Sequence, residues 1–457
     1  MTLQKDTTAL KPPAACINKS LVIPPEQHPI TSNMIDRDAL FVLRKLHSAG
    51  FIAYLVGGGV RDLYLGKTPK DFDISTDARP GQLRKLFPNS NTIGRRFRLV
   101  QVFFKGGKII EVSTLRSLSE HDLDGPEQVL APNNTFGTLA EDAQRRDLTI
   151  NSLFFDIKNN TIIDYVHGVK DLQDSTVRMV GVPTKRITRD PVRMMRAIRH
   201  SARNNFNIEN DTWEAICENC EKLALCPPSR LRDETLKDIY SGASSPWFSR
   251  AMSSGIFLTL FPLYRNILTE QTEAGANYIK QLTQVFEAID RTNTVGNNNN
   301  MGRQPTFFML ALILIPWAES KYSLFSEQRK GAQLFQISKQ IRADLNTSIG
   351  VELNLRRSLR QEMVTLLINL SSLIHNRADN SWPKWLRKKS YFKKCSLFYQ
   401  YYIEIIEGKH VTECDLQSKT EPPAEPLKTL PARKRTSGKT KPAFAPSING
   451  GVFGFKK

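Results

Sequence analysis

The spacing of apolar residues predicts a mixed α/β region in the first third of the chain. Residues 34–51, MIDRDALFVLRKLHSAGF, place apolar side chains at helical intervals and end at a glycine, a common residue at helix C-termini. Four later runs are typical of strands, and glycines or helical patterns separate them. These runs are residues 51–58, 71–76, 99–104 and 108–116. We therefore expect a mixed α/β domain that ends near residue 160.

The rest of the chain has a different pattern. From about Pro191 onward it is helical almost throughout, as in PVRMMRAIRHSARNN. The longest apolar run, Phe307–Ala318, contains a proline and is too short to span a bilayer, so it predicts a buried helix and no membrane partner. The expected fold class is α+β. The expected divisions are a disordered leader over residues 1–33, a mixed head over 34–160, helical regions over 161–265 and 266–412, and a disordered basic tail over 413–457.

Charge narrows the choice of partners. The 457 residues include 64 Lys and Arg against 45 Asp and Glu, which gives a net charge of +19. Such an excess favours polyanions, with nucleic acid first and anionic membranes second. From Leu427 to the end there are eight Lys and Arg and no Asp or Glu. This last segment is expected to be a disordered tail that adds affinity for phosphates without reading sequence.

The cysteines bear on the compartment. Cys217, Cys220 and Cys226 form a C-x2-C-x5-C pattern, but no nearby fourth Cys or His completes a zinc site. Because the surrounding sequence has helical periodicity, reduced cysteines on or near a helix are the preferred interpretation. Six cysteines in a long chain whose N-terminus lacks a secretory pattern predict a reducing, cytoplasmic location.

A glycine turn links a predicted strand to a predicted helix in LVGGGVRD, residues 55–62. Glycine lets the backbone come close to a ligand, and the N–H groups at a helix start can bind phosphate. Arg61 can add a bidentate contact. The segment lacks the Gly-Lys-Ser/Thr of a Walker A loop, and Asp62 stands where G-x-G-x-x-G needs its last glycine. The residues alone leave a phosphate site and an ordinary tight turn both open.

Two aspartates follow on the next predicted strand. In KDFDIST, Asp71 and Asp73 alternate with apolar residues, and residues i and i+2 of a strand share a face. Two carboxylates this close repel each other unless a cation lies between them, and Mg²⁺ prefers oxygen ligands. Either Glu111, in another predicted strand, or Asp147, after two arginines, would complete a metal site or position a hydroxyl group. The alternative is a strand edge with two solvated acids.

Three stretches, in this order, resemble one known family. They are LVGGGVRDLYLGKTPKDFDIST (residues 55–76), FGTLAEDAQRRDLTINSLFFD (136–156) and RDPVRMMRAIRHSAR (189–203). Over about residues 35–265 the chain resembles the class II tRNA nucleotidyltransferase and bacterial poly(A) polymerase family. The resemblance implies a nucleotidyltransferase head, a neck with nucleotide-reading and RNA-binding helices, and body and tail helices that hold RNA. Residues 92–104, TIGRRFRLVQVFF, are similar to the poly(A) polymerases rather than to CCA-adding relatives.

The resemblance also implies roles for single residues. Asp71 and Asp73 match ligands of Mg²⁺, with Mn²⁺ as an alternative ion, and Asp147 matches a third catalytic acid. The matches to nucleotide-binding positions are Gly58 and Arg61 in the triphosphate turn, Arg146 near the sugar, Asp190 and Arg193 at the base edge, and Arg196 and Arg199 further along the same helix. One position departs from the family: Arg189 stands where Glu is usual, so base reading is expected to be looser or differently supported.

Spacing agrees with these roles without proving them. The four arginines from Arg193 to Arg203 are three, three and four residues apart, so we expect them on one side of a helix that Asp190 and Pro191 open. The alternative is a helix cap followed by a solvated basic stripe. Farther along, residues 382–394, WPKWLRKKSYFKK, combine six basic residues with four aromatics. They predict either stacking on unpaired RNA bases or an amphipathic helix with buried aromatics.

The predicted function is a template-independent poly(A) polymerase. It would add AMP from ATP to RNA 3′ ends, release pyrophosphate and promote RNA processing and decay. ATP and RNA 3′ ends are the expected partners, and RNA-decay or RNA-chaperone proteins are further candidates. A CCA-adding tRNA nucleotidyltransferase is the nearest alternative. A non-catalytic RNA-binding protein on the same fold is the second, and the three aspartates argue against it.

Overall fold

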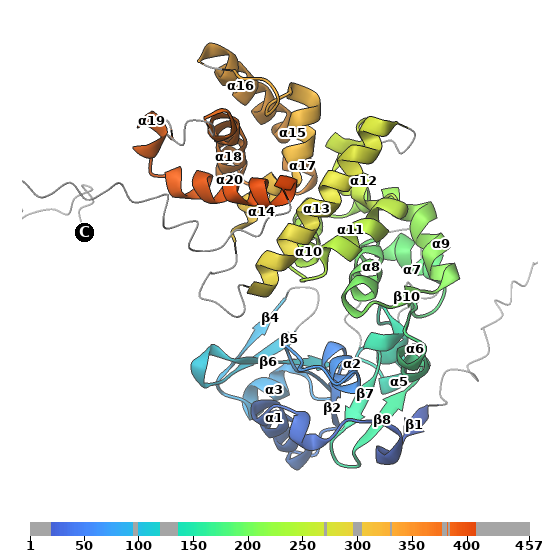
Figure 1. Ribbon diagram of the computed structural model, residues 1–457. Coiled ribbons are helices and arrows are strands. Elements are labelled where there is room, and N and C mark those ends of the chain that lie inside the picture. The colour runs from blue at the N-terminus through green and yellow to red at the C-terminus, as the bar shows by residue number, and fades with distance from the viewer. Residues whose placement is uncertain are drawn as a thin grey trace, which may run out of the picture. The chain divides into compact units, whose positions relative to one another are not determined.

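A mixed sheet of eight strands organises the N-terminal part of the chain (Figure 1). The computed structural model describes residues 20–94, 99–118, 136–268, 272–295, 304–329, 331–376, 382 and 384–407. The strands are β1 (Leu21–Ile23), β2 (Ala53–Val56), β3 (Asp73–Thr76), β4 (Ser90–Ile93), β5 (Leu99–Phe103), β6 (Ile109–Thr114), β7 (Phe154–Asp156) and β8 (Thr161–Asp164). Their order is β1-β8-β7-β2-β3-β6-β5-β4. The neighbours β3 and β6 are parallel, and the other pairs are antiparallel.

The two faces of this sheet are covered unequally. Ala53 and Leu55 of β2 belong to the main core, where α1 (Arg37–Ser48) packs against the strand. Val56, on the other face, belongs to a small separate cluster of four buried residues. Because Val56 lies directly opposite Asp73 in the antiparallel β2–β3 pair, Asp73 projects from this second face. The face with little apolar cover is therefore the one that carries the acidic groups.

Two expected boundaries need correction. Residues 1–33 were expected to form a disordered leader, but Leu21–Ile23 is strand β1 and pairs with β8. The three apolar residues of this short strand have a partner far away in sequence, which a local pattern does not reveal. The head was expected to end at residue 160, but the β7–β8 hairpin continues the sheet to Asp164. The predicted basic tail over residues 413–457 lies outside the described residues.

Short helices lie between the strands of the sheet or directly follow it. They are α2 (Gly58–Tyr64), α3 (Pro80–Leu86), α5 (Leu139–Gln144), the 3₁₀ turn η5 (Thr149–Asn151) and α6 (Gly168–Gln173).

The rest of the chain after the sheet is helical, as predicted, apart from the two-stranded pair of β9 (Thr176–Val177) and β10 (Asn207–Ile208). The next are α7 (Pro183–Arg189), α8 (Val192–Asn204), α9 (Asn210–Asn219), α10 (Pro228–Ile239), α11 (Ser244–Ser253) and α12 (Ile256–Leu260). The last are α13 (Glu273–Val295), α14 (Thr306–Ile313), α15 (Ile315–Tyr322), α16 (Ala332–Thr347), α17 (Ile349–Glu352), α18 (Arg357–His375), α19 (Lys384–Arg387) and α20 (Phe392–Glu407).

Aromatic packing holds the middle helices together. Phe248 of α11 stacks on Phe286 of α13 with ring centroids 4.7 Å apart and meets Phe257 of α12 edge-on at 4.9 Å. The longest apolar run forms α14 and the start of α15, and every residue of α14 from Phe307 onward is buried, as predicted. Within the described ranges, no helix combines the length and the apolar character that crossing a membrane requires.

The glycine at the start of α6, shortly after β8, packs closely against η5. A Cβ atom added at Gly168, the first residue of α6, would lie 2.2 Å from the carbonyl oxygen of Thr149 in η5. Gly168→Ala is therefore expected to lower the free energy of unfolding by about 1–3 kcal/mol, the usual cost of overpacking. Urea unfolding followed by circular dichroism measures the change.

A matched variant controls for the glycine-to-alanine change itself. Gly81 in α3 is exposed, and nothing lies within 4 Å of an added Cβ. Gly81→Ala should leave stability unchanged or raise it by about 0.5–1 kcal/mol, because alanine restricts the unfolded chain. Equal effects of the two variants would contradict the contact between α6 and η5.

Candidate active site

The predicted glycine turn is present between β2 and α2. Gly57 has φ +70°, a conformation that favours glycine, and Gly58 is the first residue of the helix. A Cβ atom on Gly57 would lie 3.5 Å from a guanidinium nitrogen of Arg146 and 3.9 Å from Oδ2 of Asp73. The backbone of the turn therefore passes directly beside the first carboxylate of β3 and beside a cation.

Arg61 does not point outward from this turn. Its side chain is buried, and it donates to Asp62 at 2.7 and 2.9 Å and to Asn151 Oδ1 at 2.5 Å. Its Nη1 also lies 3.2 Å from Nδ1 of His200 in α8. Burial, and then the charge of Arg61, hold the pKa of His200 well below its ordinary value, so the neutral ring can accept this hydrogen bond. Arg61 thus ties α2 to η5 and α8, which differs from the expected bidentate phosphate contact.

The carboxylates gather where β3 and β6 begin to pair. Asp73 is the first residue of β3, whereas Asp71 precedes the strand and is exposed, so the two do not share one strand face as predicted. Asp73 lies opposite Glu111 in the parallel β3–β6 register, which places both side chains on the same face. Burial, the charge of Glu111 and the charge of Asp71 raise the pKa of Asp73 to about 6, against the opposing charge of Arg146. Glu111 accepts a hydrogen bond of 3.0 Å from Gln101 of β5.

A buried aspartate positions the two arginines of the RRD motif. Asp142 of α5 is fully buried and pairs with Arg145 at 2.5 Å and with Arg146 at 2.9 Å. Although burial alone would raise it, these two cations hold the pKa of Asp142 below its ordinary value. Arg146 also donates to Ser75 of β3 at 3.3 Å. The sequence predictions did not include Asp142, although it stands three and four residues before the arginines, a spacing at which side chains on a helix can pair.

Asp147 lies with the arginines of α8 and not with the acids of β3. Its Oδ2 pairs with Arg196 Nη1 at 3.2 Å, and its own backbone neighbour Leu148 donates to Oδ1 at 2.8 Å. Against the effect of burial, Arg196 and Arg193 hold the pKa of Asp147 well below its ordinary value. Of the two acids that the sequence offered as a third partner for Asp71 and Asp73, the structure therefore brings Glu111 to Asp73.

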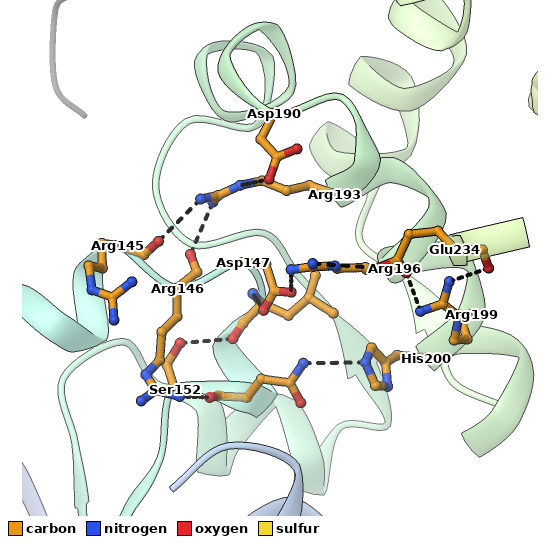
Figure 2. Close-up of polar contacts among 12 residues, drawn as sticks. Arg145, Arg146, Asp147, Ser152, Asp190, Arg193, Arg196, Arg199, His200 and Glu234 are labelled. Atoms are coloured by element: carbon orange, nitrogen blue, oxygen red, sulfur yellow. Dashed lines mark hydrogen bonds and ion pairs between the residues drawn. The ribbon is translucent and has the colours of Figure 1, made fainter. Parts of the chain in front are cut away.

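Asp190 and Arg193 lie close together, and Arg193 also reaches the chain at Arg145 and Arg146 (Figure 2). Arg193 Nε is 3.9 Å from Asp190 Oδ2, and its two Nη atoms donate to the backbone carbonyls of Arg146 and Arg145 at 3.1 and 3.2 Å. Asp190 accepts a bidentate pair of bonds from Arg230 of α10, at 2.7 and 2.8 Å. Arg230 was not predicted from the sequence, and it fixes the plane of this carboxylate.

The arginines of α8 lie on one side of the helix, as expected, but they meet different neighbours. Three residues advance a helix by about 300°, so Arg196 is turned by about 60° from Arg193, and Arg199 by about 60° from Arg196. Arg193 accordingly meets the end of α5, Arg196 spans Asp147 and Glu234 at 3.2 and 3.6 Å, and Arg199 turns to α10. Arg199 is buried and binds Glu234 at 2.6 Å and Asp238 at 2.5 Å. This burial corrects the expected nucleotide contact of Arg199, because its guanidinium is already used inside the protein.

Comparison with known proteins identifies the family. A Poly A polymerase head domain matches residues 53–178, and a Probable RNA and SrmB-binding site of polymerase A matches residues 205–268. Poly(A) polymerase I of Salmonella typhi is 41% identical over 313 residues, which are 67% of this chain and 66% of that protein. A CCA-adding enzyme of Lactobacillus gasseri is 36% identical over 305 residues, 63% of this chain and 74% of the relative. This chain belongs to the poly(A) polymerase and CCA-adding enzyme family.

Solved structures of this family confirm the fold class. An apo CCA-adding enzyme superposes with a TM-score of 0.56 at 20% identity, over 84% of this chain and 91% of that one. A CCA-adding enzyme with CTP gives a TM-score of 0.53 at 20% identity, over 84% and 90%. A mixed head followed by helical regions is therefore the shared architecture, as the sequence predicted.

The buried arginine of the family helix α8 makes a stability prediction. Burial raises the pKa of Asp238 to about 7, whereas Arg199 and Arg196, acting against burial, lower that of Glu234 to about 2. Arg199→Ala would leave both carboxylates buried without their main cation, so the free energy of unfolding should fall by about 3–5 kcal/mol. Thermal and urea unfolding measure it.

Arg203 on the same helix is the matched control, because its side chain is exposed. Arg203→Ala should change stability by no more than about 0.5 kcal/mol. If Arg199→Ala weakened nucleotide binding but unfolded with the same curve as the wild type, the assignment of Arg199 to the α8–α10 contact would be wrong.

Proposed function

We propose that this chain is a template-independent poly(A) polymerase that adds AMP from ATP to RNA 3′ ends. The observation that carries the proposal is the group formed by Gly57, Asp73, Glu111 and Arg146, where a backbone turn, two carboxylates and a cation meet. The relatives named poly(A) polymerase I are up to 42% identical over 67% of the chain, and a CCA-adding enzyme is also 42% identical but over 44% of it. Longer coverage at equal identity favours the polymerase over the CCA-adding alternative.

The acidic residues suit a divalent cation. Asp73 keeps a raised pKa because it is buried and because Glu111 and Asp71 add negative charge that Arg146 does not balance. Among the described residues, no three His, Cys, Asp or Glu side chains are placed to hold an ion by themselves. Mg²⁺ commonly uses one or two carboxylates together with substrate phosphates, which fits Asp71 and Asp73 with Glu111 beside them. Bound there, Mg²⁺ or Mn²⁺ would neutralise charge on the phosphates and favour ionisation of the attacking hydroxyl.

The residues around the acids would do the positioning. The RNA 3′-hydroxyl oxygen forms a bond to the α-phosphorus of ATP. The bond between this phosphorus and the oxygen that bridges to the β-phosphate breaks, and pyrophosphate leaves with the electron pair. Gly57 and Gly58 leave room for the triphosphate beside Asp73, and Arg146, oriented by Asp142, faces the same space. Arg61 and Asp147 act as positioning residues through Asn151 and Arg196. In a transfer of this kind, positioning and charge stabilisation supply most of the catalysis.

Base selection is assigned to Asp190 and Arg193. Adenine offers an amino donor and a ring-nitrogen acceptor, which a carboxylate and a guanidinium can meet. Cytosine offers a similar pattern, so the rigidity of the pair must contribute. The bidentate bond from Arg230 to Asp190 supplies such rigidity, and it compensates for Arg189 at the position where the family usually has Glu. A cytoplasmic location and association with other proteins of RNA decay or RNA chaperoning remain predictions.

A direct assay tests the function. With Mg²⁺ and a single-stranded RNA primer, the wild type should incorporate AMP repeatedly and use CTP, GTP and UTP poorly. Asp73→Asn should lower incorporation about 10³-fold, the loss expected when a charge-stabilising group is removed, while RNA binding persists. Asp77→Asn, an exposed acid just past the other end of β3, is the matched control and should retain activity.

Two outcomes would contradict this assignment. Addition of CMP, CMP and AMP to a tRNA without its CCA end, with little activity on other RNA, would show a CCA-adding enzyme. Intact RNA binding with no incorporation of any nucleotide would show the non-catalytic alternative.

The raised pKa of Asp73, about 6, gives a pH prediction. The ion needs the carboxylate form, so kcat/KM for ATP should fall about tenfold per pH unit below about 6 and stay level just above it. Raising Mg²⁺ should move this limb to lower pH, because a cation favours the ionised form. Glu111→Gln removes a negative charge that raises the pKa of Asp73. In this variant the acidic limb of the remaining activity should therefore also move to lower pH. A limb that is unmoved by both changes would show that another group titrates.

A further inference from the structure

The aromatics of residues 382–394 divide into packed ones and one exposed one. Trp382 meets Tyr399 of α20 edge-on, with ring centroids 5.3 Å apart, and Tyr391 and Phe392 are partly buried against the main core. Trp385 of α19, in contrast, is 52% exposed. The amphipathic interpretation therefore accounts for three of the four aromatics and leaves Trp385 without a packing role.

Trp385 is exposed although the residue that follows it is packed into the core. Its neighbour Leu386 is fully buried, and the backbone N–H of Lys389 donates to the Leu386 carbonyl at 3.0 Å. A second turn follows, in which the backbone N–H of Phe392 donates to the backbone carbonyl of Lys389 at 3.0 Å. Leu386 thus anchors α19 to the helical core and presents the neighbouring indole to solvent. A flat ligand stacked on this indole would bury its exposed ring face.

Exposed cations lie near this indole in the sequence. The exposed basic residues are Lys384, Arg387, Lys388, Lys389 and Lys393. With Trp385 they define what we call the α19 surface. Across the described ranges, no ion pair joins any of these five cations to an acid, whereas the next residue, Lys394, pairs with Glu362 at 3.3 Å and lies over the ring of Phe307. The sequence contains no Asp or Glu between Asp379 and Glu404, so the positive charge is not compensated locally.

We infer that the α19 surface binds single-stranded RNA, with an unpaired base stacked on Trp385 and phosphates on the surrounding cations. A ligand must offer both a flat π face and closely spaced negative charges, and an unpaired RNA strand offers both at every nucleotide. An anionic membrane matches the charges, but the surface has only one large exposed apolar side chain to insert. The choice of RNA rests on the proposed function.

Binding of the full chain to a single-stranded RNA of mixed sequence tests the stacking contact. Trp385→Ala should raise Kd about 5- to 100-fold, since one stacked base contributes about 1–3 kcal/mol. Trp385→Phe should restore most of the affinity. Phe335→Ala is the matched control, because Phe335 of α16 is also exposed, at 57%, and lies against Lys339 outside the surface. Its Kd should stay within about twofold of the wild type.

The charge component is tested separately by salt dependence. The double variant Lys388→Ala, Lys389→Ala should reduce the slope of log Kd against log salt by about 1.4, at about 0.7 for each phosphate contact on a single strand. Trp385→Ala should leave that slope unchanged. Duplex RNA of the same sequence should bind with little sensitivity to Trp385→Ala, because its bases are already stacked.

Several outcomes would overturn the inference. They are an unchanged Kd for Trp385→Ala, an equal loss for Phe335→Ala, or an equal loss on duplex RNA. Binding to phosphatidylserine vesicles that Trp385→Ala abolishes, with RNA binding intact, would assign the surface to membranes instead. Asp73→Asn separates this inference from the proposed function: it should lose nucleotide transfer and keep the Trp385-dependent affinity. If the wild type transfers AMP but Trp385→Ala binds RNA normally, the inference fails and the proposed function stands.

Discussion

The pairing of arginines on α8 with acids from two other elements is the interaction on which the described site depends. Arg196 bridges Asp147, which follows α5, to Glu234 of α10, and Arg199 binds Glu234 and Asp238 of α10 in a buried setting. Arginine suits this task because its planar group donates in several directions at once. Such pairs add little net stability compared with apolar packing, but losing one partner is costly. They therefore fix which helix faces which more than they hold the protein folded.

The acids of the sheet are built on the opposite principle. In the α8 network each carboxylate has an arginine partner, whereas Asp73 shares one face with Glu111, and Arg146 is the cation of the described residues that opposes their charge. Burial and this shortage of positive charge together raise the pKa of Asp73. A folded protein that keeps two acids together without enough cations lowers its own stability at neutral pH, and a bound cation would restore it. The combination of a rigid, neutralised network and a charge-deficient pair is what a metal-assisted transfer requires.

Much of the site followed from local patterns. The turn at Gly57 and the helix that carries Arg193 lie where residue spacing placed them, and the strand predicted from Asp71 is present but begins at Asp73. Side-chain direction did not follow. Arg61 turns inward to Asn151 and His200, more than 80 residues away along the chain, so no local motif could show that its donors are used. Arg199 was expected at the nucleotide because the family resemblance implied that contact, but the rotation of the helix turns it to α10.

The sequence by itself determined that a mixed head precedes helical regions, and it determined the α+β class, the family and the set of chemical groups, because these depend on periodicity and on motifs that are contiguous in the chain. Tertiary structure alone decided which acid joins Asp73: Glu111 does so because β3 and β6 pair in parallel at that register, and Asp147 does not because Arg196 holds it. It also decided that Asp190 is held by Arg230, and that Trp385 is the exposed member of its aromatic group. The physical reason is the same in each case. Strand register and helix packing join residues that are distant in the chain, and charge pairing and burial are properties of those contacts and not of the residues alone.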